Sequence, residues 1–350
     1  MQTTPLLDTL RQVQREDAID VVIPVYNAPE LTRRTIDSLY TRLGDRIAEL
    51  VVWDDASQAT TGEMLDSLRY PRLRVVHAEQ NTGFGEAVNR AVASTRTPLV
   101  LVLNSDVEAR GDFLSPLLDA MRRDPRLGSV SPAGNSLAGY DLGRYPRVHG
   151  YVPAYALWAY AFLVRRSAFD EVRGFDRSFG RGFYEDSDLS RRLLEKGWRL
   201  GIHPDAQLFH ELHGSFKEVV EYREILARNR ARYFERWPEA TRQVLLVTGD
   251  QSLGELPAAL RGEVEDVLRK GGAVQWLHAG APRELLAIPM RSARLRLLPA
   301  ARRILSRRRK RRRQFTDLWI VDGSPPLAAR ALARLGRYLA IDVRRISAAS

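Results

Sequence analysis

Short apolar runs alternate with amphipathic runs from residue 19 onward, and this alternation constrains the fold more than any other feature. The apolar runs lack polar alternation, so both faces of each strand are expected to be covered. Strands of this kind separated by helices form a mostly parallel sheet between two helical layers. We therefore predict an α/β fold with strands at 19–25, 49–53, 73–77 and 98–104 and helices at 30–40, 61–68 and 84–93.

Polar residues follow the predicted strands where each strand ends, and this is the edge at which parallel sheets bind ligands. The residues are Tyr26, Asn27, Asp54, Asp55, Ser105 and Asp106. A single acid there is as readily a helix cap or turn former. Acids at two neighbouring strand ends instead suit a divalent cation that keeps a substrate phosphate as a further ligand.

The stretch GFYEDSDLSRRLLEKGW, residues 182–198, sets three carboxylates ahead of a short amphipathic helix that Gly197 ends. Glu185, Asp186 and Asp188 have two interpretations. They can simply stabilise the first helical turn through its free N–H groups and dipole. The same field is expected to keep a carboxylate ionised at neutral pH, as a general base requires.

Two of the six histidines, His210 and His213, follow an apolar strand-like segment. A lone histidine at a strand end is more often structural. Two of them beside a candidate cation site favour a ligand role.

Composition fits a globular chain with one large domain and an appendage, since 44% of its 350 residues are hydrophobic. The apolar stretch 152–164 is too short to span a bilayer, and the amino terminus lacks the pattern of a secretory signal. The chain has no cysteine, which excludes disulfides and thiolate metal sites. We expect a cytoplasmic location.

The net charge of +11 is concentrated in the C-terminal third: residues 241–350 hold 22 Lys plus Arg against 9 Asp plus Glu. The densest part is 302–315, which favours an anionic surface such as the inner face of the cell membrane, or is simply a solvated basic segment. Aromatic residues do not interleave with this cluster, which argues against nucleic acid. Residues 239–350 are predicted to form a small Rossmann-like domain, or part of a GT-B-type unit, suited to assembly, acceptor recognition or membrane docking.

Six ordered segments resemble the family-2 inverting glycosyltransferases of GT-A fold, in particular the bacterial rhamnosyl- and galactofuranosyl-transferase-like branch. They are VVIPVYN, VVWDDAS, NTGFGEAVNRA, VLVLNSDV, RGFDRSFGRGFYEDSDLSRRLLEKGW and FHELHGS. The resemblance implies a GT-A domain over 19–238 after an N-terminal extension of 1–18. It also implies transfer of a sugar from a nucleotide-diphosphate donor to a hydroxyl of a glycan or lipid-linked acceptor, in polysaccharide or cell-envelope biosynthesis.

The resemblance also implies roles for individual residues. Asp186 would be the catalytic base and Glu185 would shape it, with Asp188 and Arg192 in the same motif. Asp106 would be the main ligand of Mn²⁺ or Mg²⁺, Asn104 would assist, and His210 would complete the site with His213 as the reserve. Asp54 and Asp55 would contact the nucleotide. The other expected donor-site positions are Pro24, Tyr26, Asn27, Asn81, Gly83, Asn89, Ser105 and Trp158.

Some alternatives stay open. Trp158 and Tyr160 stand where many relatives have small residues, so they either narrow the substrate pocket or are core aromatics. A nucleotidyltransferase would need a Gly-rich, basic loop after the first strand, where this chain reads PVYNAPEL. A catalytically silent nucleotide-sugar-binding or assembly module that docks through the basic segment is the other alternative, and a homo-oligomer is compatible with either.

Overall fold

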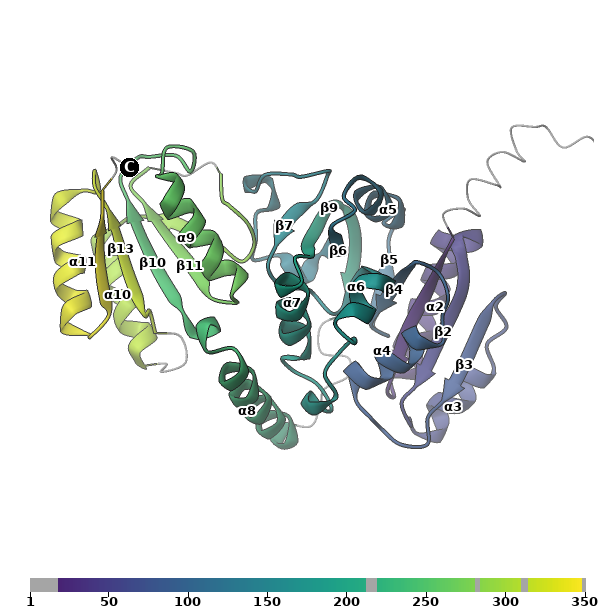
Figure 1. Cartoon of the computed structure of the whole chain (residues 1–350). Helices are drawn as coiled ribbons and strands as arrows, with labels where there is room; N and C mark the ends of the chain where they lie inside the picture. The colour runs from purple at the N-terminus through teal and green to yellow at the C-terminus, as the bar shows by residue number, and fades with distance from the viewer. Residues whose placement is uncertain (1–17, 212–218, 281–283, 310–313, 348–350) are drawn as a thin grey trace, which may run out of the picture. The chain divides into compact units, whose positions relative to one another are not determined.

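The computed structural model describes residues 18–211, 219–280, 284–309 and 314–347. They form two compact units, each with its own sheet (Figure 1). The first unit runs to residue 139 and adds 148–151 and 157–231, and the second contains 140–147, 152–156 and the chain from 232. The domain boundaries expected from the sequence, at residues 18 and 238, stay predictions.

The sheet of the first unit has the strand order β3-β2-β1-β4-β8-β6-β9-β5. Strands β1 to β4 pair in parallel, while β8 runs antiparallel to β4 and β6, and β5 runs antiparallel to β9. The strands are β1 (Ile19–Val25), β2 (Ile47–Asp54), β3 (Leu73–His77), β4 (Leu99–Leu103), β5 (Val107–Ala109), β6 (Leu127–Gly134), β8 (Ala161–Arg165) and β9 (Arg199–His210).

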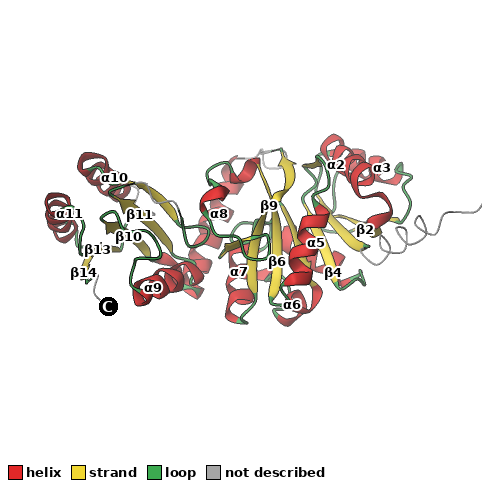
Figure 2. Ribbon diagram, turned by 90° about the horizontal axis from the view of Figure 1, so that it is seen from above, coloured by secondary structure: helices red, strands yellow, loops and turns green. Residues whose placement is uncertain are grey.

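Helices cover both faces of this sheet, and Figure 2 separates α2 and α3 from α6 and α7 across it. The helices are α2 (Pro29–Leu43), α3 (Ala59–Asp66), α4 (Phe84–Ala93), α5 (Leu114–Arg123), α6 (Arg166–Glu171), α7 (Glu185–Glu195) and α8 (Val219–Arg236). The amphipathic pattern explains which side of each helix faces the sheet: Ile36, Leu39 and Leu43 of α2 are buried at helical spacing.

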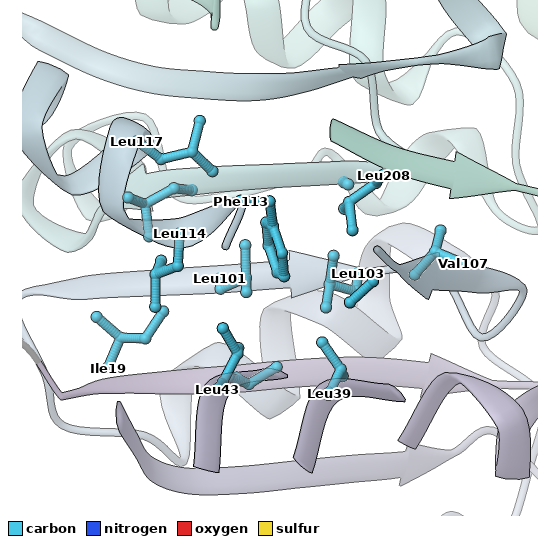
Figure 3. Close-up of a cluster of buried hydrophobic side chains, with 14 of the residues drawn as sticks. Ile19, Leu39, Leu43, Leu101, Leu103, Val107, Phe113, Leu114, Leu117 and Leu208 are labelled. Atoms are coloured by element: carbon cyan, nitrogen blue, oxygen red, sulfur yellow. The ribbon is translucent and has the colours of Figure 1, made fainter. Parts of the chain in front are cut away.

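A hydrophobic cluster lies between the sheet and the α2, α3 and α5 layer (Figure 3). Leu101 and Leu103 of β4 meet Leu39 of α2 and Phe113, the residue before α5, and none of the four is more than 1% exposed. Burying one such side chain stabilises the fold by about 1.5–3 kcal/mol. This core fixes the carboxyl ends of the strands, where the candidate site lies.

The predicted α/β class is confirmed, and the four strands and three helices predicted for residues 19–104 are all present. The apolar stretch 152–164 contains β7 (Val152–Ala154) and most of β8. The single helix predicted over 84–93 begins and ends at those residues.

The second unit is a parallel sheet of order β12-β11-β10-β13-β14. Figure 2 shows α9 on one face of this sheet and α10 and α11 on the other. Its elements are β10 (Gln243–Thr248), α9 (Ala258–Arg269), β11 (Ala273–His278), β12 (Arg291–Arg294), α10 (Leu297–Arg309), β13 (Asp317–Val321), α11 (Pro326–Tyr338) and β14 (Asp342–Ile346). The smaller α/β domain predicted at this end of the chain is thus present.

The first part of the basic segment 302–315 belongs to α10, which ends at Arg309. Residues 310–313 lie outside the described ranges. Within the part of the chain that the structure covers, no helix is both long enough and apolar enough to cross a bilayer.

Candidate active site

Strand pairing brings Asp106 and His210 together. Val107, the first residue of β5, lies opposite His210, the last residue of β9, in an antiparallel ladder. Asp106 directly precedes Val107, and its side chain lies beside that of His210, with His210 Nε2 3.1 Å from Asp106 Oδ1. Both are largely buried, the side chains being 7% exposed at Asp106 and 14% at His210.

His210 is held by three residues. Asn135 makes two hydrogen bonds with the main chain of His210, donating to the His210 carbonyl at 2.7 Å and accepting from the His210 N–H at 2.8 Å. Ser136 Oγ lies 2.9 Å from His210 Nδ1, and the Tyr160 ring stacks on the imidazole at 5.0 Å between centroids. Tyr160 is 6% exposed and donates its hydroxyl to the Pro132 carbonyl. Tyr160 is therefore a buried aromatic that orients His210.

The residues around Asp106 fit a divalent cation. Asp106 Oδ1 and Asn104 Oδ1 are both buried, and neither makes a hydrogen bond of acceptable geometry in the described structure. Unsatisfied buried oxygens of this kind are costly unless a ligand completes them. With His210 they offer carboxylate, amide and imidazole donors, a set that divalent cations accept.

This donor set is incomplete without substrate or water. Among the described residues no group of three His, Asp or Glu side chains gathers around one point. A cation here would have two such ligands, Asp106 and His210, and would take its remaining ones from substrate oxygens or water. His213, the reserve ligand, lies outside the described residues.

Asp54 and Asp55, at the end of β2, are 3% exposed and bind neighbouring loops. Asp55 accepts hydrogen bonds from the Thr82 N–H and hydroxyl and from the Gly83 N–H at 2.8–3.0 Å. Asp54 Oδ1 accepts from Ser57 N–H, and Asp54 Oδ2 lies 2.7 Å from His77 Nδ1. The turn-forming role is thus present, and the predicted nucleotide contacts stay a prediction.

His77 is a partner of Asp54 that sequence reasoning missed, although it stands at the end of a predicted strand. Its other ring nitrogen lies 3.2 Å from Asp66 of α3. The hydrogen bond to Asp54 is the main cause that raises the pKa of His77, and burial opposes it. A protonated His77 would partly neutralise the carboxylate of Asp54.

The remaining expected donor-site residues lie along the same edge or support it. Asn27 bridges to the loop after β2, accepting from the Gln58 N–H, and Asn89 of α4 makes two hydrogen bonds with the backbone of Phe175. Tyr26 is 48% exposed and Trp158 is half-buried against the core. The others are Pro24 in β1, Asn81 with a buried, unbonded Oδ1, Gly83 before α4, and Ser105, which is buried.

The loop before α7 approaches the Gly83 turn closely. A Cβ on Gly83 would lie 2.4 Å from the carbonyl oxygen of Gly180, so only glycine fits there. Asn229 of α8 holds the same loop by donating to the carbonyls of Phe179 and Gly182. The donor-side turn and the segment that carries the acids of α7 are therefore in direct contact.

Two consecutive residues ahead of the acids have left-handed backbone conformations, Phe183 with φ 72° and Tyr184 with φ 67°. Each non-glycine residue in this region costs about 1–2 kcal/mol. Such strain persists where the surroundings enforce it, commonly at functional sites. Here it directs the start of α7 and thus Glu185 and Asp186.

Burial controls the protonation of Glu185 and Asp186. Glu185 is 8% exposed, and its Oε2 makes no hydrogen bond within the described structure. Burial, followed by the neighbouring Asp186 carboxylate, raises the pKa of Glu185 to about 8. Burial also raises the pKa of Asp186, although the N–H and hydroxyl of Ser187 donate to its Oδ1. For Glu185 the expectation that the helix dipole keeps the carboxylate ionised at neutral pH is wrong, because desolvation outweighs the dipole.

Asp188 is a structural residue. It is fully buried, and its Oδ2 lies 2.7 Å from Arg192 Nε one turn further along α7. Arg192 also donates to the carbonyls of Val172 and Gly174. The pair fastens α7 to the 172–174 turn, so the three acids of the motif have different duties.

Residues 20–175 match the family model described as glycosyl transferase family 2. Over these residues the chain is similar to the family 2 glycosyltransferases. Its fold is that of the GT-A glycosyltransferases: a crystal structure of GalNAc-T7 with UDP, GalNAc and Mn²⁺ superposes with a TM-score of 0.50 at 17% identity, covering 71% of this chain and 55% of that one.

Two curated relatives come from Mycobacterium tuberculosis. The pre-mycofactocin glycosyltransferase is 29% identical over 252 residues, which cover 66% of this chain and 50% of that protein. The N-acetylglucosaminyl-diphospho-decaprenol L-rhamnosyltransferase is 27% identical over 249 residues, which cover 59% of this chain and 80% of that protein. This chain thus spans about half the length of the first relative and most of the second.

Proposed function

We propose that the protein transfers a sugar from a nucleotide-diphosphate donor to a hydroxyl of a glycan or lipid-linked acceptor, with inversion at the anomeric carbon. The observation that carries the proposal is the division of labour among the acids. Asp106 is paired with His210 at one strand edge. Asp186, the second residue of α7, has a raised pKa, and among the described residues no basic side chain is bonded to its carboxylate. The two Mycobacterium tuberculosis relatives described above are both glycosyltransferases by name, and they support the same reaction class.

Asp106 and His210, with Asn104, would hold Mn²⁺ or Mg²⁺, as GalNAc-T7 holds Mn²⁺. When bound, the cation supplies Lewis-acid neutralisation of the charge that develops on the departing diphosphate. The protein's own contribution is to orient these side chains: Ser136 and the Tyr160 ring fix the imidazole before any substrate arrives.

Asp186 would act as the base. Its Oδ1 is held by Ser187, while Oδ2 makes no hydrogen bond in the described structure and can accept the proton of the acceptor hydroxyl. As that proton leaves, the acceptor oxygen bonds to the anomeric carbon and the bond from that carbon to the diphosphate oxygen breaks. A base with a raised pKa has more driving force for proton abstraction near neutral pH.

The deciding experiment measures sugar-nucleotide turnover with a panel of donors in Mn²⁺ or Mg²⁺, and donor binding in parallel. We expect Asp186→Asn to lose about 10²–10⁴-fold in turnover while it binds donor as the parent does. Glu195→Gln, an exposed acid at the far end of the same helix, is the matched control and should turn over normally. An Asp186→Asn protein as active as its parent, or a parent silent on the whole panel, would favour the silent binding module instead.

We further propose that the basic segment 302–315 contacts anionic membrane, where a lipid-linked acceptor would lie. Co-sedimentation with vesicles that contain anionic lipid is expected to fall when Arg307–Arg313 is replaced by glutamine. Equal sedimentation of both proteins would reject this part of the proposal and leave the transfer reaction untouched.

A further inference from the structure

The second unit has a topological switch point of its own. Its five strands all run in parallel, and their order across the sheet is 3-2-1-4-5 when β10 is counted as the first strand. Strand β10 therefore lies between β11 and β13 (Figure 1). The connections from β10 and β13 therefore leave the sheet in opposite directions. In sheets of this kind a crevice forms at the carboxyl ends of those two strands, and ligands bind there.

Glycine and acidic residues occupy this edge. Gly249 follows β10 and Gly323 lies two residues after β13, and a Cβ on Gly249 would lie 2.3 Å from the Gly323 carbonyl oxygen. Gln251 joins the same two loops by donating from Nε2 to the Asp322 carbonyl. The carboxylates of Asp250 and Asp322 belong to exposed residues on these loops.

Two hydrogen-bond acceptors at this edge are buried and unsatisfied. His278, the last residue of β11, is 3% exposed, and its Nε2 lies 2.7 Å from the Gln251 carbonyl oxygen. That contact requires a proton on Nε2, so Nδ1 of a neutral ring carries a lone pair. Neither His278 Nδ1 nor Gln251 Oε1 has a hydrogen-bond partner among the described residues. An unsatisfied buried polar atom costs about 1–3 kcal/mol, so two of them at one edge call for a ligand.

The imidazole of His278 lies beside Gly280. A Cβ on Gly280 would lie 3.4 Å from His278 Nδ1 and 3.1 Å from Asp250 Oδ1. A side chain at position 280 would therefore crowd both His278 Nδ1 and Asp250 Oδ1, and glycine keeps the backbone side of these two acceptors open. In the first unit this edge of the sheet carries the candidate transferase site, so the second unit repeats the same placement on separate strands.

We propose that this edge of the second unit binds a neutral carbohydrate. Its groups are acceptors: an imidazole nitrogen, an amide oxygen and two carboxylates. They suit a ligand that offers several hydroxyl donors, and the negative charge of Asp250 and Asp322 disfavours phosphate. The proposal goes beyond glycosyl transfer and does not depend on it, because binding at this site is measured without donor or metal.

The test is ligand-observed saturation-transfer NMR on the full chain with methyl glycosides of glucose, mannose, galactose and rhamnose, in EDTA and without nucleotide. At least one glycoside is expected to bind, and to bind equally in an Asp106→Ala background that disables the first site. Gly280→Ala should weaken binding about tenfold, the equivalent of one lost hydrogen bond. Gly254→Ala is the matched control, since a methyl group there meets nothing within 4 Å.

A second readout is the ¹⁵N resonance of His278 Nδ1, which should shift on addition of the bound glycoside because the lone pair gains a donor. The proposal is overturned if no glycoside binds, if Gly280→Ala binds as its parent does, or if binding leaves the Nδ1 resonance unchanged. Binding of adenosine in place of every glycoside would also overturn it, in favour of a nucleoside site.

Discussion

The buried pair in α7 gives the most direct prediction of stability. Asp188→Asn keeps the shape of the side chain and removes its charge, while Arg192 stays 14% exposed with its guanidinium still positive. Removing one partner of a buried ion pair costs about 3–5 kcal/mol, because the other charge is left uncompensated. The bonds from Arg192 to the carbonyls of Val172 and Gly174 persist, so we expect the lower end, about 3 kcal/mol.

Urea unfolding, followed by the fluorescence of tryptophan, measures this loss as a lower midpoint at unchanged slope. The matched control is Asp119→Asn on α5, whose carboxylate is 46% exposed and bonds Arg122 and Arg123 at the surface. An exposed pair contributes about 0–1 kcal/mol, so the control should unfold close to the parent. If Asp188→Asn also stays within about 1 kcal/mol of the parent, Asp188 does not fasten α7 and the structural assignment fails.

Titration and backbone contact in the first unit give three more expected results. Because the pKa of Glu185 is raised from 4.5 to about 8, the protonated carboxyl favours folding at pH values below 4.5, and this contribution is lost as the pH rises through about 8. In urea unfolding, Glu185→Gln should therefore be more stable than the parent at pH 8.5 but not at pH 4. By NMR, His77 should titrate above 6.5, and Asp54→Asn should lower its pKa. Gly83 has φ 86°, and a methyl group there would lie 2.4 Å from the Gly180 carbonyl oxygen. Gly83→Ala should therefore lower the free energy of unfolding in urea by at least about 2 kcal/mol, and a variant as stable as the parent would contradict the contact.

Periodicity predicted the central strands and helices because their apolar residues are buried by the layers on both sides. The same reasoning missed β12, whose four residues are Arg-Ser-Ala-Arg and which lies at the sheet edge, where no apolar face is required. It also did not predict β8 as a strand, and an apolar run does not reveal whether a strand pairs in parallel or antiparallel.

The candidate site shows a similar division. Motif order identified Asp106 and His210 as partners, and the β5–β9 ladder brings them within 3.1 Å. Their supports, Asn135 and Ser136, follow a strand that the sequence did not reveal, so no pattern pointed to them. The protonation of Glu185 was misjudged because burial depends on residues far along the chain, which a local dipole argument ignores.

The antiparallel ladder between β5 and β9 limits how this protein can be engineered. Side chains alternate sides along a strand, so inserting one residue into β9 ahead of His210 would turn the imidazole to the opposite face of the sheet. A two-residue insertion would restore its facing. Engineered insertions or deletions between Arg199 and His210 should therefore add or remove an even number of residues.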